Sequence, residues 1–202
     1  MNENQAQEEL KFIKEMMKKA SRTFIFSGWQ WVSWGIIFSI GSLFTYLILI
    51  GKEVEEVGNI LLFFWIGLSV VGILIEFLIF RKKVFKLGIG LFSKLVIQVT
   101  IAECFMTFLG VILTYVLINL NSYQYIPGLW LLVMGVTFTI AGMFSFKEII
   151  YSSLMLIVSG VIAIVILPNY SLLIFGLFAG LGFIIEGMKI NIKHKEELRT
   201  EG

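Results

Sequence analysis

The stretch NILLFFWIGLSVVGILIEFLIFRKKVFK, residues 59–86, decides the fold of this chain. Its first 22 residues hold a single charged side chain, Glu76, and four of its last six residues are Arg or Lys. A helix that crosses the hydrocarbon core of a bilayer needs about 20 apolar residues and satisfies its own backbone groups. The stretch therefore predicts a transmembrane helix that ends in a basic loop on the cytoplasmic side.

Five further apolar segments repeat this pattern. Hydrophobic residues make up 58% of the chain and charged residues only 15%, with a mean hydropathy of +0.91, whereas soluble domains are about half apolar and one quarter charged. We therefore predict an all-α integral membrane protein with six transmembrane helices. The helices are expected near residues 23–50, 59–80, 94–118, 128–146, 148–167 and 170–188.

Residues suited to tight turns separate these helices on one side of the membrane. On the other side, the boundary near Ser145–Glu148 has no such residues, but it is required because one uninterrupted helix from 129 to 167 would be about 58 Å long. The turns on the first side are predicted at Gly51, Gly58-Asn59, Pro127-Gly128 and Pro168-Asn169.

The distribution of basic residues predicts the orientation. Fifteen of the sixteen Lys and Arg residues lie in the N-terminal arm, in alternate connections or in the C-terminal tail, and the other connections hold Lys52 alone. Because Lys and Arg in short loops stay on the cytoplasmic side, both termini are predicted to be cytoplasmic. The net charge of +2 then follows from topology, so we expect the lipid bilayer, and no nucleic acid, as a partner.

The chain divides into an arm over residues 1–22, a transmembrane domain over 23–188 and a charged tail over 189–202. Apolar residues of the arm recur at three- and four-residue steps, which is typical of an amphipathic helix that lies on the inner leaflet or docks on a partner. With about 22 residues before the first helix and about 14 after the last, we expect no soluble catalytic domain at either end. The apolar residues are Leu10, Ile13, Met17, Ala20 and Phe24.

Two short patterns occur twice along the chain. They predict three tandem helical hairpins that enter the membrane from the same side, as parallel repeats do. Chance similarity between apolar segments is the alternative interpretation. Gly41-Ser-Leu-Phe-Thr45-Tyr46 in the first helix recurs as Gly110-Val-Ile-Leu-Thr114-Tyr115 in the third, and Gly72-Ile-Leu-Ile-Glu76 in the second recurs as Gly182-Phe-Ile-Ile-Glu186 in the sixth.

The last hairpin contains Gly160-Val-Ile-Ala-Ile-Val-Ile-Leu-Pro168-Asn169, followed by Gly180, Gly182 and Gly187. Over about residues 156–188 it resembles the repeat of the HdeD-like family, six-helix bacterial inner-membrane proteins associated with acid stress. The first hairpin departs from that repeat, because Glu-rich residues 52–56 replace a Pro turn. The resemblance implies a multi-pass protein of the bacterial cytoplasmic membrane with a role in stress, and it brings no catalytic residues.

Few residues offer chemistry for a catalytic or metal site. Cys104 is the only cysteine and lies in an apolar segment, which excludes an intramolecular disulfide and a CxxC site. His194 is the only histidine, and Asp is absent, so a zinc site and a Ser-His-Asp triad are excluded. We expect no cofactor, no metal and no enzymatic activity.

Three Glu residues within apolar segments are the candidate functional residues, since an ionisable group at the bilayer centre costs roughly 2.5–3.5 kcal/mol on insertion scales. Glu76 and Glu186 lie within five residues of Arg81 and Lys189, so we expect them to reach headgroups or these cations. Glu103 lies deeper in the third helix, without a Lys or Arg within one turn.

Glu103 belongs to a polar stripe whose members follow steps of 3, 4, 3 and 4 residues, and we expect this helix face to point into the bundle. Two interpretations stay open. Glu103 is protonated and hydrogen-bonds a neighbouring helix, for example near Gln30 and Ser33, or it lines a hydrated path and takes up a proton or cation. The stripe comprises Thr100, Glu103, Thr107, Gly110 and Thr114.

Small and aromatic residues predict packing and anchoring. Small residues let helices approach closely, and aromatic residues near helix ends form belts at the membrane surface. The small residues are Gly28, Gly35 and Ser42 in the first helix and Gly176, Gly180 and Gly187 in the sixth; the expected belts are Trp29, Trp31 and Trp34 at one end and Tyr46, Tyr123, Tyr125, Trp130 and Tyr170 at the other.

These features predict a small, non-enzymatic, accessory or stress-associated membrane protein that acts through helix–helix contacts with a second copy or another membrane protein. The alternative is a transporter or channel for a proton, a cation or a small solute, with Glu103, Gln30 and the threonines of the stripe as its path. The stripe favours transport, whereas parallel hairpins and unbroken helices favour packing.

Overall fold

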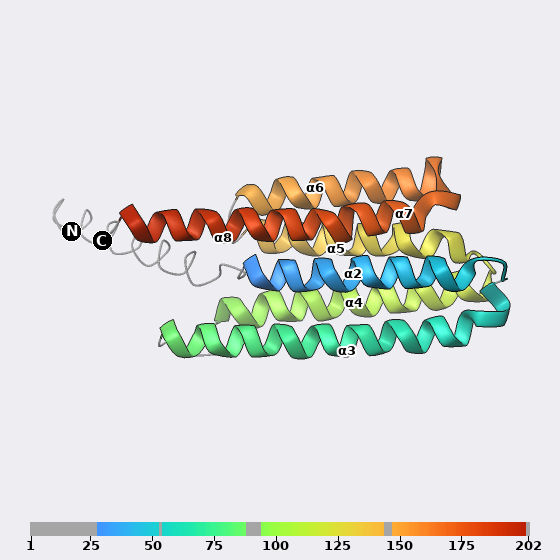
Figure 1. Cartoon of the computed structure of the whole chain (residues 1–202), viewed down its shortest axis with the longest axis horizontal. Coiled ribbons are helices and arrows are strands. Elements are labelled where there is room, and N and C mark those ends of the chain that lie inside the picture. The colour runs from blue at the N-terminus through green and yellow to red at the C-terminus, as the bar shows by residue number, and fades with distance from the viewer. Residues whose placement is uncertain (1–27, 53, 88–93, 144–146, 201–202) are drawn as a thin grey trace, which may run out of the picture.

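The structure of the protein, a computed structural model, describes residues 28–52, 54–87, 94–143 and 147–200 (Figure 1). In these ranges it consists of helices and short turns without strands, which confirms the all-α class, and six of its helices are long and apolar enough to cross a membrane. The elements are α2 (Gly28–Leu49), α3 (Val54–Leu87), α4 (Lys94–Asn119), η1 (Tyr123–Tyr125), α5 (Ile126–Met143), α6 (Lys147–Val161), η2 (Ile162–Ile166), η3 (Pro168–Tyr170), α7 (Ser171–Phe175), η4 (Gly176–Leu181) and α8 (Gly182–Thr200).

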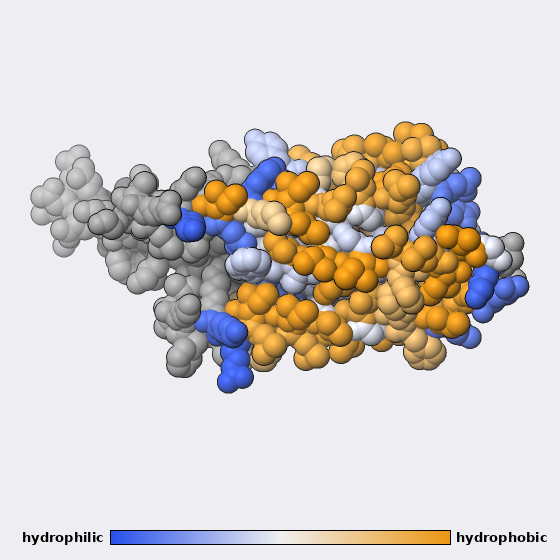
Figure 2. Space-filling view, in the orientation of Figure 1, coloured by the Kyte–Doolittle hydropathy of each residue, from blue (hydrophilic) through white to orange (hydrophobic). Residues whose placement is uncertain are grey.

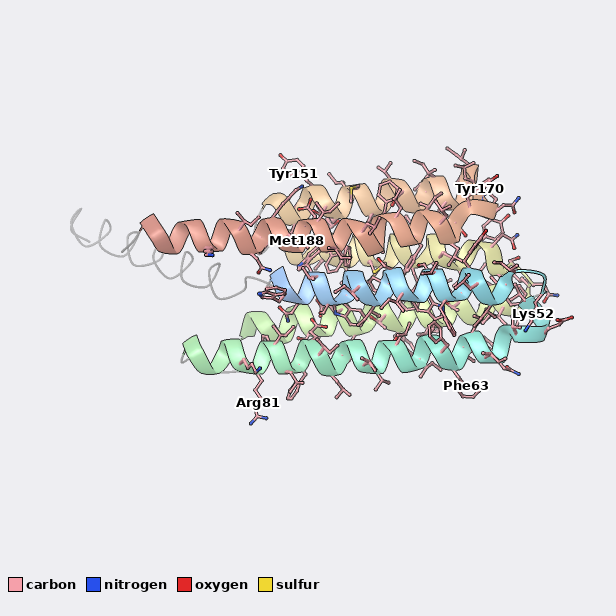
Figure 3. All side chains as sticks on the ribbon, in the orientation of Figure 1. Lys52, Phe63, Arg81, Tyr151, Tyr170 and Met188 are labelled. Atoms are coloured by element: carbon pink, nitrogen blue, oxygen red, sulfur yellow. The ribbon has the colours of Figure 1, made fainter. Side chains whose placement is uncertain are left out.

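The helices form two layers of three (Figure 1). In one layer α2 lies between α3 and the segment α7–η4–α8, and in the other layer α5 lies between α4 and α6. One end of the bundle carries Arg81, and we call it the basic end; the turns after α2, α4 and η2 form the other, the loop end, which carries Lys52 and Tyr170 (Figure 3). Figure 2 shows hydrophilic residues at both ends and a broad hydrophobic band between them, as expected of a bundle that spans a membrane.

The predicted helices are present, with some ends shifted. Gly58 lies inside α3 and Gly128 inside α5, so the turns predicted at Gly58-Asn59 and Pro127-Gly128 are wrong. The observed turns use Gly51 (φ 70°) and Asn121 (φ 52°), two residue types that adopt a left-handed backbone at low cost. The predicted break near Ser145–Glu148 is confirmed, because α5 and α6 are separate helices that pack against each other.

The structure leaves the prediction for the N-terminal arm untested and corrects the prediction for the C-terminal tail. The predicted amphipathic arm over residues 1–22 lies outside the described residues. Most of the predicted charged tail, which begins at residue 189, belongs to the last helix, because α8 extends to Thr200. The expectation of unbroken helices is also only partly correct, since the π-helical segments η2 and η4 interrupt the fifth and sixth spans.

The core lies between α2, α5, α6 and the segment α7–η4–α8. Trp31 of α2 contacts Phe138 of α5 and Phe183 of α8, with ring centroids 4.8 Å apart in both pairs. Of the two predicted roles, anchoring and packing, the buried Trp31 has the packing role and is not part of a belt, whereas Trp29, Tyr46 and Tyr170 are exposed as a belt requires. The other buried residues of this core are Leu131, Ile149, Leu156, Ala163, Ile174, Phe175 and Ala179.

The small residues of the first and last spans serve helix packing, as predicted, and the structure shows that these two spans pack against each other. A Cβ atom added at Gly28 would overlap the carbonyl oxygen of Gly187, and one added at Gly35 would lie 2.7 Å from the carbonyl oxygen of Gly180. Since a real Cβ does not approach backbone this closely, only glycine allows α2 to lie this near to η4 and α8. This contact closes the layer that holds the first and last spans.

The helices α3 and α4 are much less buried than the others. Within their apolar windows, 11% of α3 and 6% of α4 are buried, compared with 33–39% in the other four spans. α3 packs mainly on α2, and α4 mainly on α5. These two helices thus form an edge of the bundle with a wide exposed surface.

Candidate functional site

Glu76 is held against the first helix by a tryptophan. Trp34 Nε1 donates a hydrogen bond of 3.0 Å to Glu76 Oε2, and its ring lies over Gly72, one turn earlier in α3, where an added Cβ would be 2.5 Å from Trp34 Cη2. We expected Glu76 to reach headgroups or Arg81, but this contact instead joins α3 to α2. The glycine makes room for the ring, and the carboxylate accepts the indole N–H.

Glu103 lies on α4, within electrostatic reach of Glu76 on α3. It is half-buried, and its carboxyl group interacts electrostatically with that of Glu76. The structure therefore brings together two of the three predicted intramembrane carboxylates, a pairing for which the sequence offered no spacing argument. We define these two residues as the carboxylate pair.

The polar stripe around Glu103 divides between two environments. Gly110 is buried and Thr114 half-buried against α5, as predicted, but Thr100 and Thr107 are exposed. The expectation that the whole stripe points into the bundle is therefore wrong for these two threonines. Because α4 packs mainly on α5, the side of α4 that holds them is covered by no other described element.

A second tryptophan contact explains the inner part of the stripe. Trp130 Nε1 donates to Thr114 Oγ1 at 3.1 Å, and Thr114 Oγ1 in turn donates to the carbonyl oxygen of Gly110 at 2.8 Å. The ring of Trp130 lies over Gly110, 3.3 Å from where its Cβ would be. Thr114 is thus part of a packing contact between α4 and α5.

Trp65 makes the same contact in the first hairpin, and the sequence interpretation missed it. Its Nε1 donates to Thr45 Oγ1 at 3.0 Å, and its ring lies over Gly41, 2.6 Å from an added Cβ. The signal that was available is the repeated Gly-x3-Thr pattern, since glycine leaves a hollow for a ring and threonine offers an acceptor one turn later.

The two remaining candidates lie away from the carboxylate pair. Glu186 binds Lys189, with Oε1 and Nζ 2.9 Å apart, which confirms the predicted pairing with a nearby cation. Gln30 is buried near the start of α2, at the basic end. The Ser33 hydroxyl next to it donates to the carbonyl oxygen of Gln30 at 2.8 Å.

The exposed surface of α3 and α4 beside the carboxylate pair is the second feature of this region, and we call it the open face. Its large side chains include Phe63, which points away from the bundle in Figure 3, on the side opposite to Tyr151 of α6. It also carries small and weakly polar residues, which are Gly67, Ser69, Thr100, Cys104 and Thr107.

The chemistry available here is limited to proton or cation binding and to helix contacts. Charging both of two interacting carboxyl groups inside a membrane is unfavourable, so such a pair favours the binding of a proton or a cation. Within the described ranges, no group of three or more His, Cys, Asp or Glu side chains could hold a metal ion.

Comparisons with known proteins do not add to this picture. The similarity to the HdeD-like repeat noted above stays a prediction. Searches of protein-family models, of curated proteins and of solved structures found no match to this chain.

Proposed function

We propose that this chain is a small, non-enzymatic protein of the bacterial cytoplasmic membrane that acts through lateral helix contacts, with the open face of α3 and α4 as its interaction surface. In this proposal both termini lie in the cytoplasm. An accessory or stress-associated role fits such a protein, because a contact surface within the membrane lets it act on a neighbouring membrane protein.

The unequal burial of the six spans carries this proposal. The apolar windows of α3 and α4 are 11% and 6% buried, against 33–39% in the other four spans. Lipid is as apolar as leucine, so helices in membranes associate through close packing and polar contacts rather than through hydrophobicity alone. Two spans that bury so little within their own chain are available for such packing with another one.

The composition of the open face supports the same proposal. Thr100, Cys104 and Thr107 are exposed on one side of α4, and small or hydroxyl-bearing residues are those that membrane helices place at their contacts. The open face also exposes long or branched apolar side chains, such as Ile66 and Ile101, and α6 exposes residues of the same kind, which are Tyr151, Leu154, Met155, Val158 and Val161.

Site-specific photocrosslinking in intact membranes tests this function. A benzophenone amino acid at Phe63 or Phe108 is expected to form protein adducts, whereas the same probe at Tyr151 is expected to react with lipid only. Phe63 and Tyr151 are matched controls, since both are aromatic and about 70% exposed and they lie on opposite sides of the bundle. Equal adduct formation at all three sites, or none at Phe63 and Phe108, contradicts the proposal.

A second candidate function is proton or cation transport, and the carboxylate pair favours it. Ionisable residues inside a membrane often mark proton or ion pathways, and Glu76 and Glu103 come from different helices and interact electrostatically. The exposure of Thr100 and Thr107 weighs against the inward path that we predicted for the stripe.

Flux measurements on the purified protein in liposomes separate the two functions. Transport predicts proton- or cation-dependent flux that Glu103→Gln abolishes while the fold stays intact. A role in helix contacts predicts no flux in either protein. Glu186→Gln is the matched control, because Glu186 lies in another span and is paired with Lys189.

A further inference from the structure

The first four spans consist of one two-helix unit that occurs twice. In unit 1, which α2 and α3 form, Trp65 binds Thr45, and in unit 2, which α4 and α5 form, Trp130 binds Thr114. Each ring also lies over the glycine one turn before its threonine. The structural contact thus repeats together with the sequence pattern, which argues against chance similarity. It aligns α2 with α4 at an offset of 69 residues and α3 with α5 at an offset of 65.

The two units are related by a half-turn about an axis along the helices. α2 is the middle helix of its layer and α3 the outer one, whereas in the other layer α4, the counterpart of α2, is the outer helix and α5 is the middle one. α2 and α4 also both run from the basic end to the loop end (Figure 1). In many membrane proteins built from repeats, one repeat moves as a rigid body against the other.

Each unit is held together more closely than the two units are held to each other. Inside unit 1, α3 packs on α2 through hydrogen bonds of Trp34 and Trp65, and inside unit 2, α4 packs on α5 through that of Trp130. Between the units, the rings of Trp31 and Phe138 contact each other. Within the described ranges, however, no extended helix packing links a helix of unit 1 to a helix of unit 2.

The third hairpin joins the two units along one side only. α6 packs mainly on α5 of unit 2, while η4 and α8 pack mainly on α2 of unit 1. The π-helical segment η4 belongs to this joint, and such segments occur frequently at functional sites. In the part of the chain that the structure describes, α3 and α4 make no extended contact with the third hairpin or with each other. A hinge at the third hairpin therefore lets the units separate at the edge that α3 and α4 form.

The carboxylate pair spans the seam between the units. Glu76 belongs to unit 1 and Glu103 to unit 2, and the two carboxyl groups interact electrostatically. Neither of them forms an ion pair with a described residue, so nothing there offsets their repulsion when both are charged. The hydrogen bond from Trp34 favours the charged form of Glu76. Glu103 is therefore the group that takes up a proton first.

The helices that pack on α3 and α4 place no charge against the pair. α2 and α5 hold no Lys, Arg, His, Asp or Glu, and Glu186 of α8 is bound to Lys189. The titratable residues of these four helices, apart from the pair and the exposed Cys104, lie toward the helix ends. They are Tyr46 in α2, Glu55, Glu56, Arg81, Lys82, Lys83 and Lys86 in α3, and Lys94 and Tyr115 in α4.

We propose that Glu76 and Glu103 form a proton-operated latch between unit 1 and unit 2, with the third hairpin as the hinge. When the pair holds a proton, the edge that α3 and α4 form is closed. When both carboxyl groups are ionised, their repulsion separates α3 from α4 and widens that edge. The latch is a device within one chain, so it goes beyond the contact function and needs no partner on the open face.

Repulsion of this kind is large enough to move such an equilibrium. Two unit charges about 10 Å apart, at an effective dielectric constant of about 20, shift the ratio of two states by roughly tenfold or more. The seam offers little resistance, because α3 and α4 bury so little of their surface. Rising pH, which ionises the pair, should therefore open the edge, and falling pH should close it.

Distances between spin labels test the latch in the full chain in lipid nanodiscs. One pair of labels is attached at Ile73→Cys in α3 and Phe105→Cys in α4, and the control pair at Tyr151→Cys in α6 and Met188→Cys in α8, all with Cys104→Ala. The four labelled positions are exposed. From mildly acidic to mildly alkaline pH, at constant Na⁺ concentration, the α3–α4 distance should lengthen by several ångströms. The control distance on the hinge side should stay the same.

A neutral substitution separates the latch from other causes of a pH response. Glu103→Gln removes one charge of the pair and should keep the α3–α4 distance short at every pH. Glu186→Gln is the matched control, because Glu186 is bound to Lys189 in another span, and it should leave the pH response unchanged. Helix content and the control distance show that each variant is folded.

A pH-independent α3–α4 distance in the protein with its native Glu103 overturns the latch, and so does an equal pH response in Glu103→Gln. A distance that follows the Na⁺ concentration at fixed pH, and not the pH, overturns the proton as the operating ligand. The photocrosslinking result is independent of these outcomes. Adducts at Phe63 and Phe108 without a pH response leave the contact function standing and overturn the latch, whereas a pH response without adducts supports the latch and overturns the contact function.

Discussion

The surface of α5 that contacts α6 carries smaller residues than the exposed surface of α3 does at the matching positions. On α5, Gly128, Gly135 and Gly142 form a smooth surface on which side chains of α6 and η2 lie directly against the backbone. On α3 the counterparts are Phe63, Val70 and Phe77, and all three are exposed. The same two-helix unit therefore serves as a tight support for a neighbour in one place and as an outer surface in the other.

This comparison shows what glycine does in the bundle. An added Cβ at Gly135 would lie 3.0 Å from both Ile157 N and Ser153 O, which are backbone atoms that cannot move aside without displacing α6. At Gly67 on the open face, no atom lies within 4 Å of an added Cβ. The need for glycine thus depends on the neighbour and not on the helix that carries it.

Exchanging residues between matching positions of α5 and α3 is expected to change the free energy of unfolding the most. Gly135→Val places in α5 the residue that α3 carries at position 70, and it should lower the free energy of unfolding by about 3 kcal/mol or more, because the new side chain meets backbone. The measurement is reversible unfolding in mixed detergent micelles, followed by helix content.

The reverse exchange is the control. Val70→Gly should cost no more than about 1 kcal/mol, the usual effect of glycine within a helix. Equal losses for the two substitutions would mean that the α5–α6 contact is not the tighter one, and the comparison of covered and open faces would fail.

Much of the fold could be predicted from the sequence, because the membrane imposes simple rules. The length of the apolar segments predicted the six spans, and the small residues Gly28, Gly35 and Gly187 were predicted to serve helix packing, although the sequence did not say which helices they join. The order of the helices could not be predicted, since every span is apolar on all sides and hydrophobic periodicity carries little information in lipid.

The candidate site was only partly predictable for the same reason. Thr100 and Thr107 share a stripe with Glu103 and Thr114, but which part of that stripe is covered depends on where α5 lies. The tryptophans near helix ends were predicted to anchor in the membrane surface or to pack, and the sequence named no partner for them. The bonds from Trp34 to Glu76 and from Trp130 to Thr114 became visible only with the neighbouring helices in place.

The tryptophan contact at the carboxylate pair should give the next largest effect. Trp34→Phe keeps an aromatic ring over Gly72 but removes the hydrogen bond to Glu76, and it should lower the free energy of unfolding by about 1.5–3 kcal/mol if the carboxylate is charged. Glu76→Gln keeps an oxygen acceptor for Trp34 Nε1 and should cost less. The same unfolding measurement compares the two, and a larger loss for Glu76→Gln would contradict this role of Trp34.

The two equivalent hydrogen bonds, from Trp65 to Thr45 and from Trp130 to Thr114, should contribute similar amounts to the free energy of unfolding. Trp65→Phe and Trp130→Phe each remove one hydrogen bond to a threonine, from Thr45 and Thr114 respectively, and each should lower the free energy of unfolding by about 0.6–1.5 kcal/mol. Unfolding curves of both variants, with Trp29→Phe as an exposed control, test the equivalence. Values that differ by more than about twofold would show that the two units are not equivalent in energy.

The smallest change in the free energy of unfolding is expected at Ser39, which lies on the side of α2 that packs on the last span. Ser39 Oγ is buried and has no hydrogen-bond partner among the described residues, while its counterpart in α4 is the exposed Phe108. Ser39→Ala should change the free energy of unfolding by less than about 0.5 kcal/mol, because relief from burying the hydroxyl offsets the lost contact with Gly180.

Ser153→Ala is the informative comparison for this substitution. The buried Ser153 hydroxyl accepts a hydrogen bond from Thr139 and donates one to the carbonyl oxygen of Ile150, so its loss should cost about 1 kcal/mol. An equally large loss for Ser39→Ala would show that the Ser39 hydroxyl is engaged, and that α2 and the last span are joined by a polar contact as well as by their glycines.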